Sequence, residues 1–235
     1  MGRATPPPFV FTSTEVRAHP FVPEVRLRLA HDVMGLWEET EEAMGRGALA
    51  PPFWASVWPG GLALARYLFE HPALVLGRTV IDVATGSGVV AIAAALAGAR
   101  SVAAYDTDEL AVHVARLNAG LNQVDVAVGK AHVRDVWAPA GALVTAGDVF
   151  YEREIARDML ASLTALVDVG SEVLIGDPYR SFFPRDHLEP LANFDVDVDE
   201  ALEGKSVRST LVARLSGAVG GNSVGSLRDA GSGDR

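Results

Sequence analysis

The sequence predicts an α/β fold built on an open, mostly parallel β-sheet whose last strand is antiparallel. Between residues 79 and 177, short apolar runs that end in an acid or a glycine alternate with helix-length stretches, which is typical of a doubly wound parallel sheet. Two strand-like segments, residues 194–198 and 207–215, then follow each other with no helix-length gap. A hairpin is the natural connection for such a pair, so the final strand is expected to run against the others.

The first 50 residues are expected to form an N-terminal helical extension. Apolar residues in the segment 22–44 recur at mixed helical spacing, which indicates one or two helices. The glycines and prolines of residues 45–52 end this segment. A further helix pattern covers residues 62–70 and stops at His71 and Pro72.

The alternating region belongs to a single domain, which we place at residues 51–215. Its predicted strands are the runs TVIDV, SVAAYD, LVTAGD and EVLIGD, with another within residues 124–133. Helices are expected at residues 89–97, 109–121 and 152–167, with a short one at 185–192. Residues 216–235 are rich in Gly, Ser and Asp, so we expect a disordered tail.

The composition argues against several classes of function. The 235 residues contain no cysteine, which excludes disulfides and thiol catalysis and fits a cytoplasmic location. The formal net charge is -10, and no cluster of Lys and Arg offers a surface for nucleic acid. No apolar stretch reaches the roughly 20 residues that a membrane-spanning helix needs. The six histidines lack the spacing of a metal site, so no metal is expected.

A glycine turn after the first strand of the alternating region indicates a ligand site. Gly86 and Gly88 directly precede the helix that is expected at residue 89, where backbone N–H groups can face an anionic group of a ligand. Asp82 ends the preceding strand. Asp106 ends the next strand, 20 residues after Gly86, where a carboxylate can accept hydrogen bonds from both hydroxyls of a ribose.

The turn is compatible with two kinds of cofactor. The spacing Gly86-x-Gly88-x-x-Ala91 also fits the dinucleotide fingerprint, so an oxidoreductase with a nicotinamide cofactor is one alternative. However, the carboxylate of Asp82 would repel a pyrophosphate and attract a cationic amino group. The long segment before the turn and the expected terminal hairpin also depart from the dinucleotide fold. S-adenosylmethionine, which has an amino group, a sulfonium and a ribose but no phosphate, meets these constraints.

Four stretches of the chain carry a resemblance to a known family. They are PPFWASVWPGGLALARYL, VIDVATGSGVVAIAAALAGA, GDVFYE and LIGDPYR. On these motifs the chain resembles the seven-β-strand (class I) methyltransferases that use S-adenosylmethionine, most of all the branch of the electron-transfer flavoprotein β-subunit lysine methyltransferases and their bacterial relatives. The resemblance implies a Rossmann-like sheet of seven strands.

The resemblance also implies roles for individual residues. The motif Asp-x-Phe-Tyr, of which Asp148 and Tyr151 are the candidate catalytic residues, would lie at the mouth where the methyl group is transferred. The candidate cofactor-binding residues are Trp58, Asp82, Ala84, Thr85, Gly86, Gly88, Asp106, Thr107, Asp135 and Val136.

Two positions depart from the family pattern. Ala84 replaces the first glycine of the turn, which is acceptable if φ is negative at that position. Tyr179 stands where relatives have a glycine, in a loop that is expected to border the acceptor site. Tyr179 therefore puts the identity of the substrate in question, whereas use of the cofactor is unaffected.

The favoured interpretation is a cytoplasmic methyltransferase that acts on lysine in a protein, such as an electron-transfer flavoprotein subunit. A lysine must lose a proton before it attacks, and burial in an apolar mouth lowers its pKa. Asp148 would orient the amine, and a protein substrate predicts an open cleft edged by Phe53, Tyr179 and Arg180. The alternatives are a small-molecule N-methyltransferase that acts on an amine or a pyridine nitrogen, as a nicotinamide N-methyltransferase does, and a non-catalytic binding module.

Overall fold

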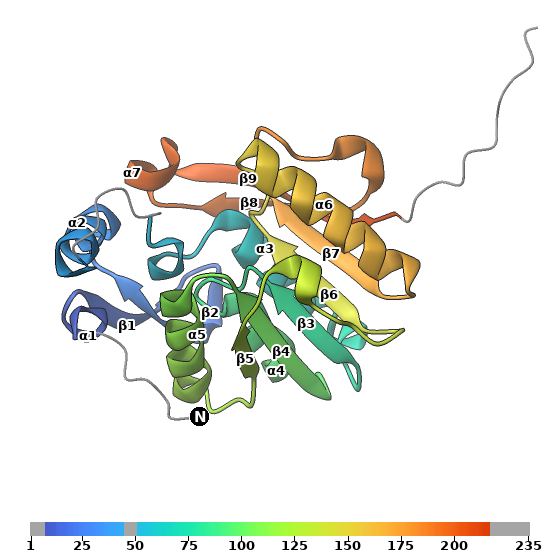
Figure 1. Ribbon diagram of the computed structural model, residues 1–235, viewed down its shortest axis with the longest axis horizontal. Coiled ribbons are helices and arrows are strands. Elements are labelled where there is room, and N and C mark those ends of the chain that lie inside the picture. Colours follow the sequence, from blue (N-terminus) through green and yellow to red (C-terminus); the bar gives the residue numbers. More distant parts are fainter. Residues whose placement is uncertain (1–7, 45–50, 217–235) are drawn as a thin grey trace, which may run out of the picture.

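A sheet of seven strands forms the centre of the computed structural model, which describes residues 8–44 and 51–216 (Figure 1). The strand order is β5-β4-β3-β6-β7-β9-β8, and only β9 runs against its neighbours, as the sequence predicts. The seven strands are β3 (Thr79–Val83), β4 (Ser101–Asp106), β5 (Ala127–Lys130), β6 (Leu143–Gly147), β7 (Glu172–Asp177), β8 (Leu188–Asp197) and β9 (Val207–Leu215).

Helices cover both faces of the sheet, and the alternation of side chains along each strand explains why. On β3, Val80 joins the core beneath helices α3 and α4, whereas Ile81 joins the core beneath α6. Leu143 and Val144 on β6 divide in the same way. The central strands are apolar on both faces because both faces are buried. The covering helices are α3 (Pro59–Glu70), α4 (Val89–Leu96), α5 (Glu109–Leu121) and α6 (Arg153–Asp168).

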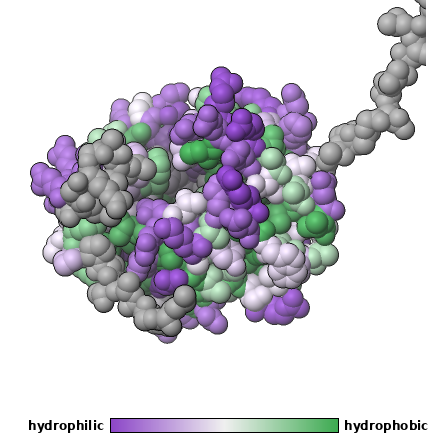
Figure 2. Space-filling model, in the orientation of Figure 1, coloured by the Kyte–Doolittle hydropathy of each residue, from purple (hydrophilic) through white to green (hydrophobic). Residues whose placement is uncertain are grey.

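These four helices agree with the sequence prediction to within a few residues, and α5 begins at an Asp108 N-cap whose carboxylate accepts from the Leu110 N–H. Figure 2 shows hydrophilic side chains over the start of α6, in keeping with its exposed Arg153, Glu154 and Arg157. The short 3₁₀ helices are η1 (Phe53–Ala55), η2 (Pro72–Leu74), η3 (Val133–Asp135) and η4 (Arg185–His187), and α7 (Glu200–Glu203) lies between β8 and β9.

The N-terminal segment is only partly helical: of the one or two helices predicted over residues 22–44, the part up to residue 30 is wrong. It contains α1 (Phe9–Thr12), a hairpin of β1 (Thr14–His19) and β2 (Val22–Ala30), and α2 (Val33–Met44). Val25, Leu27 and Leu29 are buried while the residues between them are more exposed, which is the period of two of a strand. Pairing with β1 therefore outweighs the helical spacing that the apolar residues share with their neighbours.

The hairpin is attached to the main sheet layer through α5. Asn118 and Asn122, one helical turn apart, accept from the backbone N–H groups of Arg28 and Arg26 through their side-chain oxygens. Asn122 also donates to the carbonyl of Arg26. Two asparagine side chains thus satisfy backbone groups of β2 that no strand pairs with, and they fix the hairpin on the helix layer.

The predicted helix at residues 185–192 is also mostly wrong. Only η4 is helical there, and β8 begins at Leu188 because it pairs with β9 from Leu188 opposite Leu215 onwards. Pro190 is tolerated in β8 because β8 is an edge strand with an irregularity at that point. The predicted tail falls outside the described residues except for Ser216, and no helix within the described ranges is long and apolar enough to span a membrane.

Candidate active site

A cleft of about 780 Å³ opens at the carboxyl edge of the sheet. Its walls come from the turns after β3, β4 and β6, the start of α6, and the segment around η1. Open α/β sheets bind their ligands at this edge. Seven of the predicted site residues line the cleft, namely Trp58, Ala84, Gly86, Asp106, Thr107, Asp148 and Tyr151.

The glycine turn adopts a backbone that favours glycine. Gly86 and Gly88 have φ of 52° and 86°. Ala84 has φ of 53°, so the condition under which alanine is acceptable there is not met, and its left-handed conformation costs about 1–2 kcal/mol. A Cβ on Gly86 would meet only the Cα of Trp54, at 4.0 Å, whereas on Gly88 it would lie 3.3 Å from the Cβ of Ala115. Gly88 therefore lets α4 approach α5, while Gly86 leaves space open at the cleft.

Asp106 fastens this turn from the end of β4. Its Oδ2 accepts from the N–H of Gly86 at 2.9 Å, and its Oδ1 accepts from the N–H of Asp108 at 3.0 Å. Burial raises the pKa of the Asp106 carboxyl, and these two N–H groups oppose that shift. The carboxylate lies on the cleft wall, where it has lone pairs left for the hydroxyls of a ligand.

Asp82 lies behind the turn rather than on the cleft wall. The hydroxyls of Thr85 and Thr145 donate to its two carboxylate oxygens at 2.5 and 2.7 Å. The side chain is buried, and burial raises its pKa to about 6. Asp82 and Thr85 thus fix the shape of the turn from inside, and neither they nor Gly88 line the cleft.

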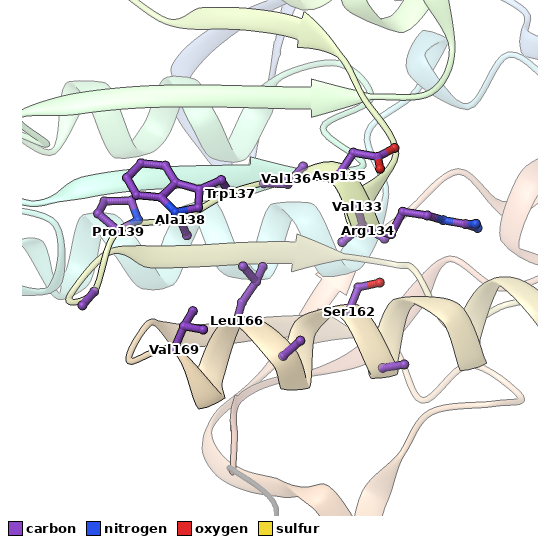
Figure 3. A pocket seen from close by; sticks show the side chains of 13 residues that line it. Val133, Arg134, Asp135, Val136, Trp137, Ala138, Pro139, Ser162, Leu166 and Val169 are labelled. Atoms are coloured by element: carbon purple, nitrogen blue, oxygen red, sulfur yellow. The ribbon is translucent and has the colours of Figure 1, made fainter.

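Asp135 and Val136 lie outside the cleft, contrary to what the resemblance implies. They line a separate groove of about 740 Å³ between the segment after β5 and α6 (Figure 3). The indole of Trp137 lies in the same groove and is 77% exposed. In the cleft itself, the segment after β5 contributes Ala131, His132 and Val133 instead.

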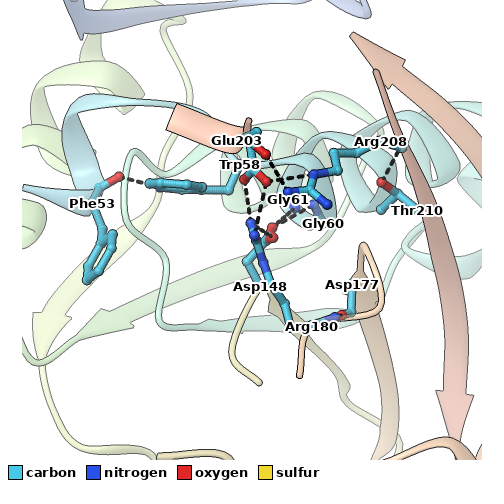
Figure 4. Close-up of polar contacts among 10 residues, drawn as sticks. All are labelled: Phe53, Trp58, Gly60, Gly61, Asp148, Asp177, Arg180, Glu203, Arg208 and Thr210. Atoms are coloured by element: carbon cyan, nitrogen blue, oxygen red, sulfur yellow. Dashed lines mark hydrogen bonds and ion pairs between the residues drawn. The ribbon is translucent and has the colours of Figure 1, made fainter. Parts of the chain in front are cut away.

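Asp148 lines the cleft as a buried side chain and has φ of 55°. Its Oδ2 accepts from two N–H groups at the start of α3, those of Gly60 at 2.6 Å and Gly61 at 3.2 Å (Figure 4). Its Oδ1 accepts from Nη2 of Arg180 at 2.9 Å. Burial raises the pKa of Asp148 to about 6, although the guanidinium and the helix N–H group lower it.

Aromatic side chains form one side of the cleft. The ring of Phe53 lies 5.7 Å from that of Trp58 and 5.4 Å from that of Tyr151, and the indole N–H of Trp58 donates to the Phe53 carbonyl at 2.8 Å. Phe53 and Arg180 line the cleft as expected, but Tyr179 does not. The φ of Tyr179 is 61°, which explains physically why a glycine suits this position.

The cleft has a strong excess of negative charge. Among the lining residues that the structure describes, Arg180 is the only arginine, and it forms an ion pair with Asp148. A cationic ligand is favoured over a pyrophosphate in such surroundings. Among the described residues, no group of His, Cys, Asp and Glu is placed to hold a metal ion. The lining carboxylates are those of Asp106, Asp108, Asp148, Glu152, Glu154 and Asp158.

Known proteins resemble the chain over most of its length. A family model of ribosomal protein L11 methyltransferase (PrmA) matches residues 69–145. The electron transfer flavoprotein beta subunit lysine methyltransferase of Xenopus laevis is 36% identical over 204 residues, which cover 81% of this chain and 79% of that protein. The protein of the same name from Danio rerio is 35% identical over 88% of this chain and 82% of its own length. The chain belongs to the electron transfer flavoprotein beta subunit lysine methyltransferase family.

Solved structures agree with the fold of this family member. The Pyrococcus horikoshii protein PH1948 aligns with a TM-score of 0.56 at 16% identity, over 79% of this chain and 98% of that one. The Thermoplasma acidophilum protein 1320 aligns with a TM-score of 0.52 at 18% identity, over 67% and 90%. At these identities the likeness shows a common Rossmann-like fold.

The protein is therefore a methyltransferase that depends on S-adenosylmethionine, and its cleft fits this cofactor. Asp106 offers a carboxylate for the ribose, the open space at Gly86 admits a ligand close to backbone, and the acidic lining suits a cationic sulfonium. Tyr105, Val133 and Ile155 add apolar surface to the cleft wall. No phosphate has to be neutralised, in keeping with the single arginine.

Sequence reasoning did not find the partners of Arg180. Glu203 and Arg208 belong to α7 and β9, more than 20 residues away along the chain, yet they form ion pairs that reach Asp148 through Arg180. No local motif signals such a contact, because it depends on how β8, α7 and β9 return to the cleft. The Trp-Pro-Gly-Gly segment, by contrast, was a usable signal for the N–H groups that bind Asp148.

Proposed function

We propose that this methyltransferase transfers the methyl group of S-adenosylmethionine to the ε-amine of a lysine in a protein, and that the protein is an electron-transfer flavoprotein β subunit. The observation that supports this most directly is the position of Asp148. It is a buried carboxylate in an acidic cleft whose mouth is lined by partly exposed aromatic rings. The names of the relatives point to the same acceptor.

We assign the residues of the cleft to two tasks. Asp106, Thr107, Gly86, Ala84 and Trp58 hold the cofactor. When it is bound, the cofactor supplies an electrophilic methyl group on a sulfonium, and transfer is a direct displacement by the lysine nitrogen. The catalytic task belongs to Asp148 and Tyr151.

Asp148 suits an acceptor that is a cation in solution. Its carboxylate attracts the ammonium form of lysine and orients the nitrogen through a hydrogen bond. The amine must release a proton to solvent before it attacks, and the aromatic wall of Phe53 and Tyr151 favours the neutral form by excluding water. As the nitrogen bonds to the methyl group it becomes positively charged again, and the fixed carboxylate stabilises this charge.

The test is methylation of a purified substrate. The protein would be incubated with S-adenosylmethionine carrying an isotopically labelled methyl group and with purified electron-transfer flavoprotein, followed by mass spectrometry of the peptides. Label on a lysine of the β subunit is the expected result. Label that appears only in small amines or pyridines of a cell extract would assign the enzyme to the small-molecule alternative, and label on another protein would correct the substrate.

A further inference from the structure

Arg180 links the cleft to the last part of the sheet. Its Nη2 donates to Oδ1 of Asp148 at 2.9 Å and to Oε1 of Glu203 at 2.5 Å, and its Nη1 donates to Oε2 of Glu203 at 3.0 Å (Figure 4). The pairing with Glu203 therefore uses two nitrogens, whereas the pairing with Asp148 uses one. Bidentate pairing with a carboxylate fixes the plane of a guanidinium.

Glu203 is itself held in place. Its side chain is 3% exposed, and Nε of Arg208 donates to its Oε2 at 2.9 Å while Nη2 of Arg208 donates to its backbone carbonyl at 2.5 Å. A buried charge that is bonded on two sides leaves its place only at a high cost in free energy. Glu203 thus acts as a fixed anchor, which sets where the guanidinium of Arg180 stands.

The two oxygens of Asp148 have different partners. Gly60 and Gly61 take up Oδ2, and Arg180 takes up Oδ1. The charged groups that face Asp148 are Arg180 from the loop after β7, Glu203 from α7 and Asp177 from the end of β7. Of these, only Arg180 is a cation, and the two acids both disfavour a charged Asp148.

The fully buried position of Asp148 adds to the demand for a cation. Burial alone raises the pKa of its carboxyl, and the charge of Glu203 raises it further, while Arg180 is the largest opposing influence. Without the guanidinium, burial and the charge of Glu203 would raise the pKa of the carboxyl further. A protonated Asp148 could neither attract an ammonium nor stabilise the positive nitrogen that forms during methyl transfer.

We propose that Arg180 is a positioning residue, which keeps the Asp148 carboxylate ionised and aimed at the acceptor amine, and that Glu203 holds Arg180 in the place where it can do so. This rests on the proposed function of Asp148. Arg180 also lies 5.7 Å from the ring of Trp58, so the same guanidinium packs against the aromatic wall of the cleft.

The first test reads the protonation of Asp148 without any catalysis. Protein labelled with ¹³C at aspartate carboxyls would be titrated by NMR, and loss of a signal in Asp148→Asn would identify the resonance. The midpoint for Asp148 should rise by at least about one pH unit in Arg180→Met, and Arg180→Lys should bring it back to within about half a unit of the natural protein. An unchanged midpoint in Arg180→Met would overturn the proposal.

A double variant covers the risk that Arg180→Met leaves Glu203 short of a partner and unfolds. In Arg180→Met with Glu203→Gln the buried pair is removed together, so no anchor charge is stranded. The midpoint of Asp148 should still rise, by less than in the single variant because the charge of Glu203 is gone too. A midpoint that stays or falls in the folded double variant counts against the role of Arg180.

The second test is the pH profile of methyl transfer at saturating substrates. Relative to the natural protein, kcat of Arg180→Met should fall at least about twofold at about pH 7 and recover to near parity at about pH 9, where Asp148 ionises unaided. Arg185→Met, in the same loop with its guanidinium 4.8 Å from the Tyr179 ring, is the matched control and should behave normally.

The two tests separate the possible failures. A loss of rate that is equal at every pH would indicate a merely structural role for Arg180 and would overturn the proposal. If the natural protein does not methylate the flavoprotein subunit, the proposed function fails, while the NMR midpoint still decides whether Arg180 sets the ionisation of Asp148.

Discussion

Asp148 combines an unusual backbone conformation, a buried position and hydrogen bonds to both of its carboxylate oxygens. Its φ of 55° places it in a conformation that is uncommon for a residue other than glycine, and Ala84 and Tyr179 share this feature nearby. Its carboxylate accepts from two N–H groups and a guanidinium. Residues that keep a strained backbone in this way tend to lie at functional sites, because the surrounding structure fixes them there.

Replacement of Asp148 by asparagine tests its catalytic role. Asn keeps the size of the side chain but removes the charge, so kcat is expected to fall at least tenfold, about 1.4 kcal/mol, while affinity for S-adenosylmethionine stays within about twofold. Steady-state methylation and isothermal titration would measure the two. Asp195→Asn, an exposed change on the edge strand β8, is the control. Normal turnover in Asp148→Asn would remove the residue from its proposed role.

The same substitution at Asp106 and at Asp135 compares a carboxylate that lines the cleft with one that lies outside it. Asp106→Asn removes the charge of a side chain that lies on the cleft wall and accepts a hydrogen bond from the N–H of Gly86. We therefore expect the affinity for S-adenosylmethionine to fall by about tenfold or more. Asp135→Asn should leave that affinity within about twofold, because Asp135 lines the separate groove. Calorimetric titration of both variants would check this, and equal losses would contradict the position of Asp135.

The candidate site could be predicted as far as its local motifs reach. The strand ends and glycines predict a site at Gly86 and Asp106, and both residues line the cleft, because a strand, a tight turn and a helix follow directly in sequence. Asp135 and Val136, which the family pattern implies for the cofactor, do not line the cleft, because the path after β5 brings His132 and Val133 there. Contacts such as that of Arg180 with Glu203 form only when β8, α7 and β9 fold back onto the sheet, so no local sequence motif predicts them.

At the scale of elements, α3 lies close enough to the sheet for backbone to touch backbone. A Cβ on Gly60 would lie 2.1 Å from the carbonyl oxygen of Gly176 on β7, and a Cβ on Gly176 would lie 2.1 Å from that of Gly60. Gly147 on β6 is similarly close to Gly61. This close approach brings the first N–H groups of α3 within hydrogen-bonding distance of Asp148. The packing of α3 on the sheet therefore also determines the geometry of the site.

Alanine at Gly60 is expected to destabilise the protein severely. The new methyl group would collide with backbone that cannot give way, at a cost of about 3 kcal/mol or more, or it would prevent folding. Gly120→Ala is the matched control, because a Cβ there meets nothing and alanine in a helix is favoured by about 1 kcal/mol. Urea unfolding of both variants measures the difference, and equal stability would contradict the close approach of α3.

Prediction of the elements succeeded where one period dominated. Residues 109–121 read as a helix and form α5 with those bounds. The helix prediction failed over residues 22–30 because two spacings coexist there. Val22, Val25 and Leu29 fit helical spacing, whereas Val25, Leu27 and Leu29 fit a strand. Pairing with β1 and the hydrogen bonds from Asn118 and Asn122 decide between the two, and both are tertiary.

At the scale of the whole molecule, burial raises the pKa of three aspartates that lie in the interior of the described chain. Burial raises that of Asp82 and that of Asp148 to about 6, and it raises that of Asp177 to about 7. Each therefore binds its proton more tightly in the folded chain than in the unfolded one. The contribution of these groups to the free energy of unfolding falls as pH rises from about 4 to about 7.

A substitution at Asp177 tests this pH dependence of the free energy of unfolding. Its Oδ1 accepts from the N–H of Arg180 at 2.6 Å, but its buried Oδ2 has no hydrogen-bond partner. Asp177→Asn should have its smallest effect on stability at about pH 4 and should stabilise by on the order of 1 kcal/mol or more at about pH 8, where the natural carboxyl is charged. Thermal unfolding at both values, with Asp195→Asn as an exposed control, would check it. A pH-independent difference would show that Asp177 does not titrate as described.

The order of strands also bears on how the chain is made. β9 is the last strand of the described chain, yet it lies between β7 and β8 in the sheet. On a ribosome, β7 and β8 emerge first and cannot join until β9 arrives. A nascent chain therefore displays an open strand edge on β7 until β9 has been synthesised, and an open edge of this kind favours aggregation.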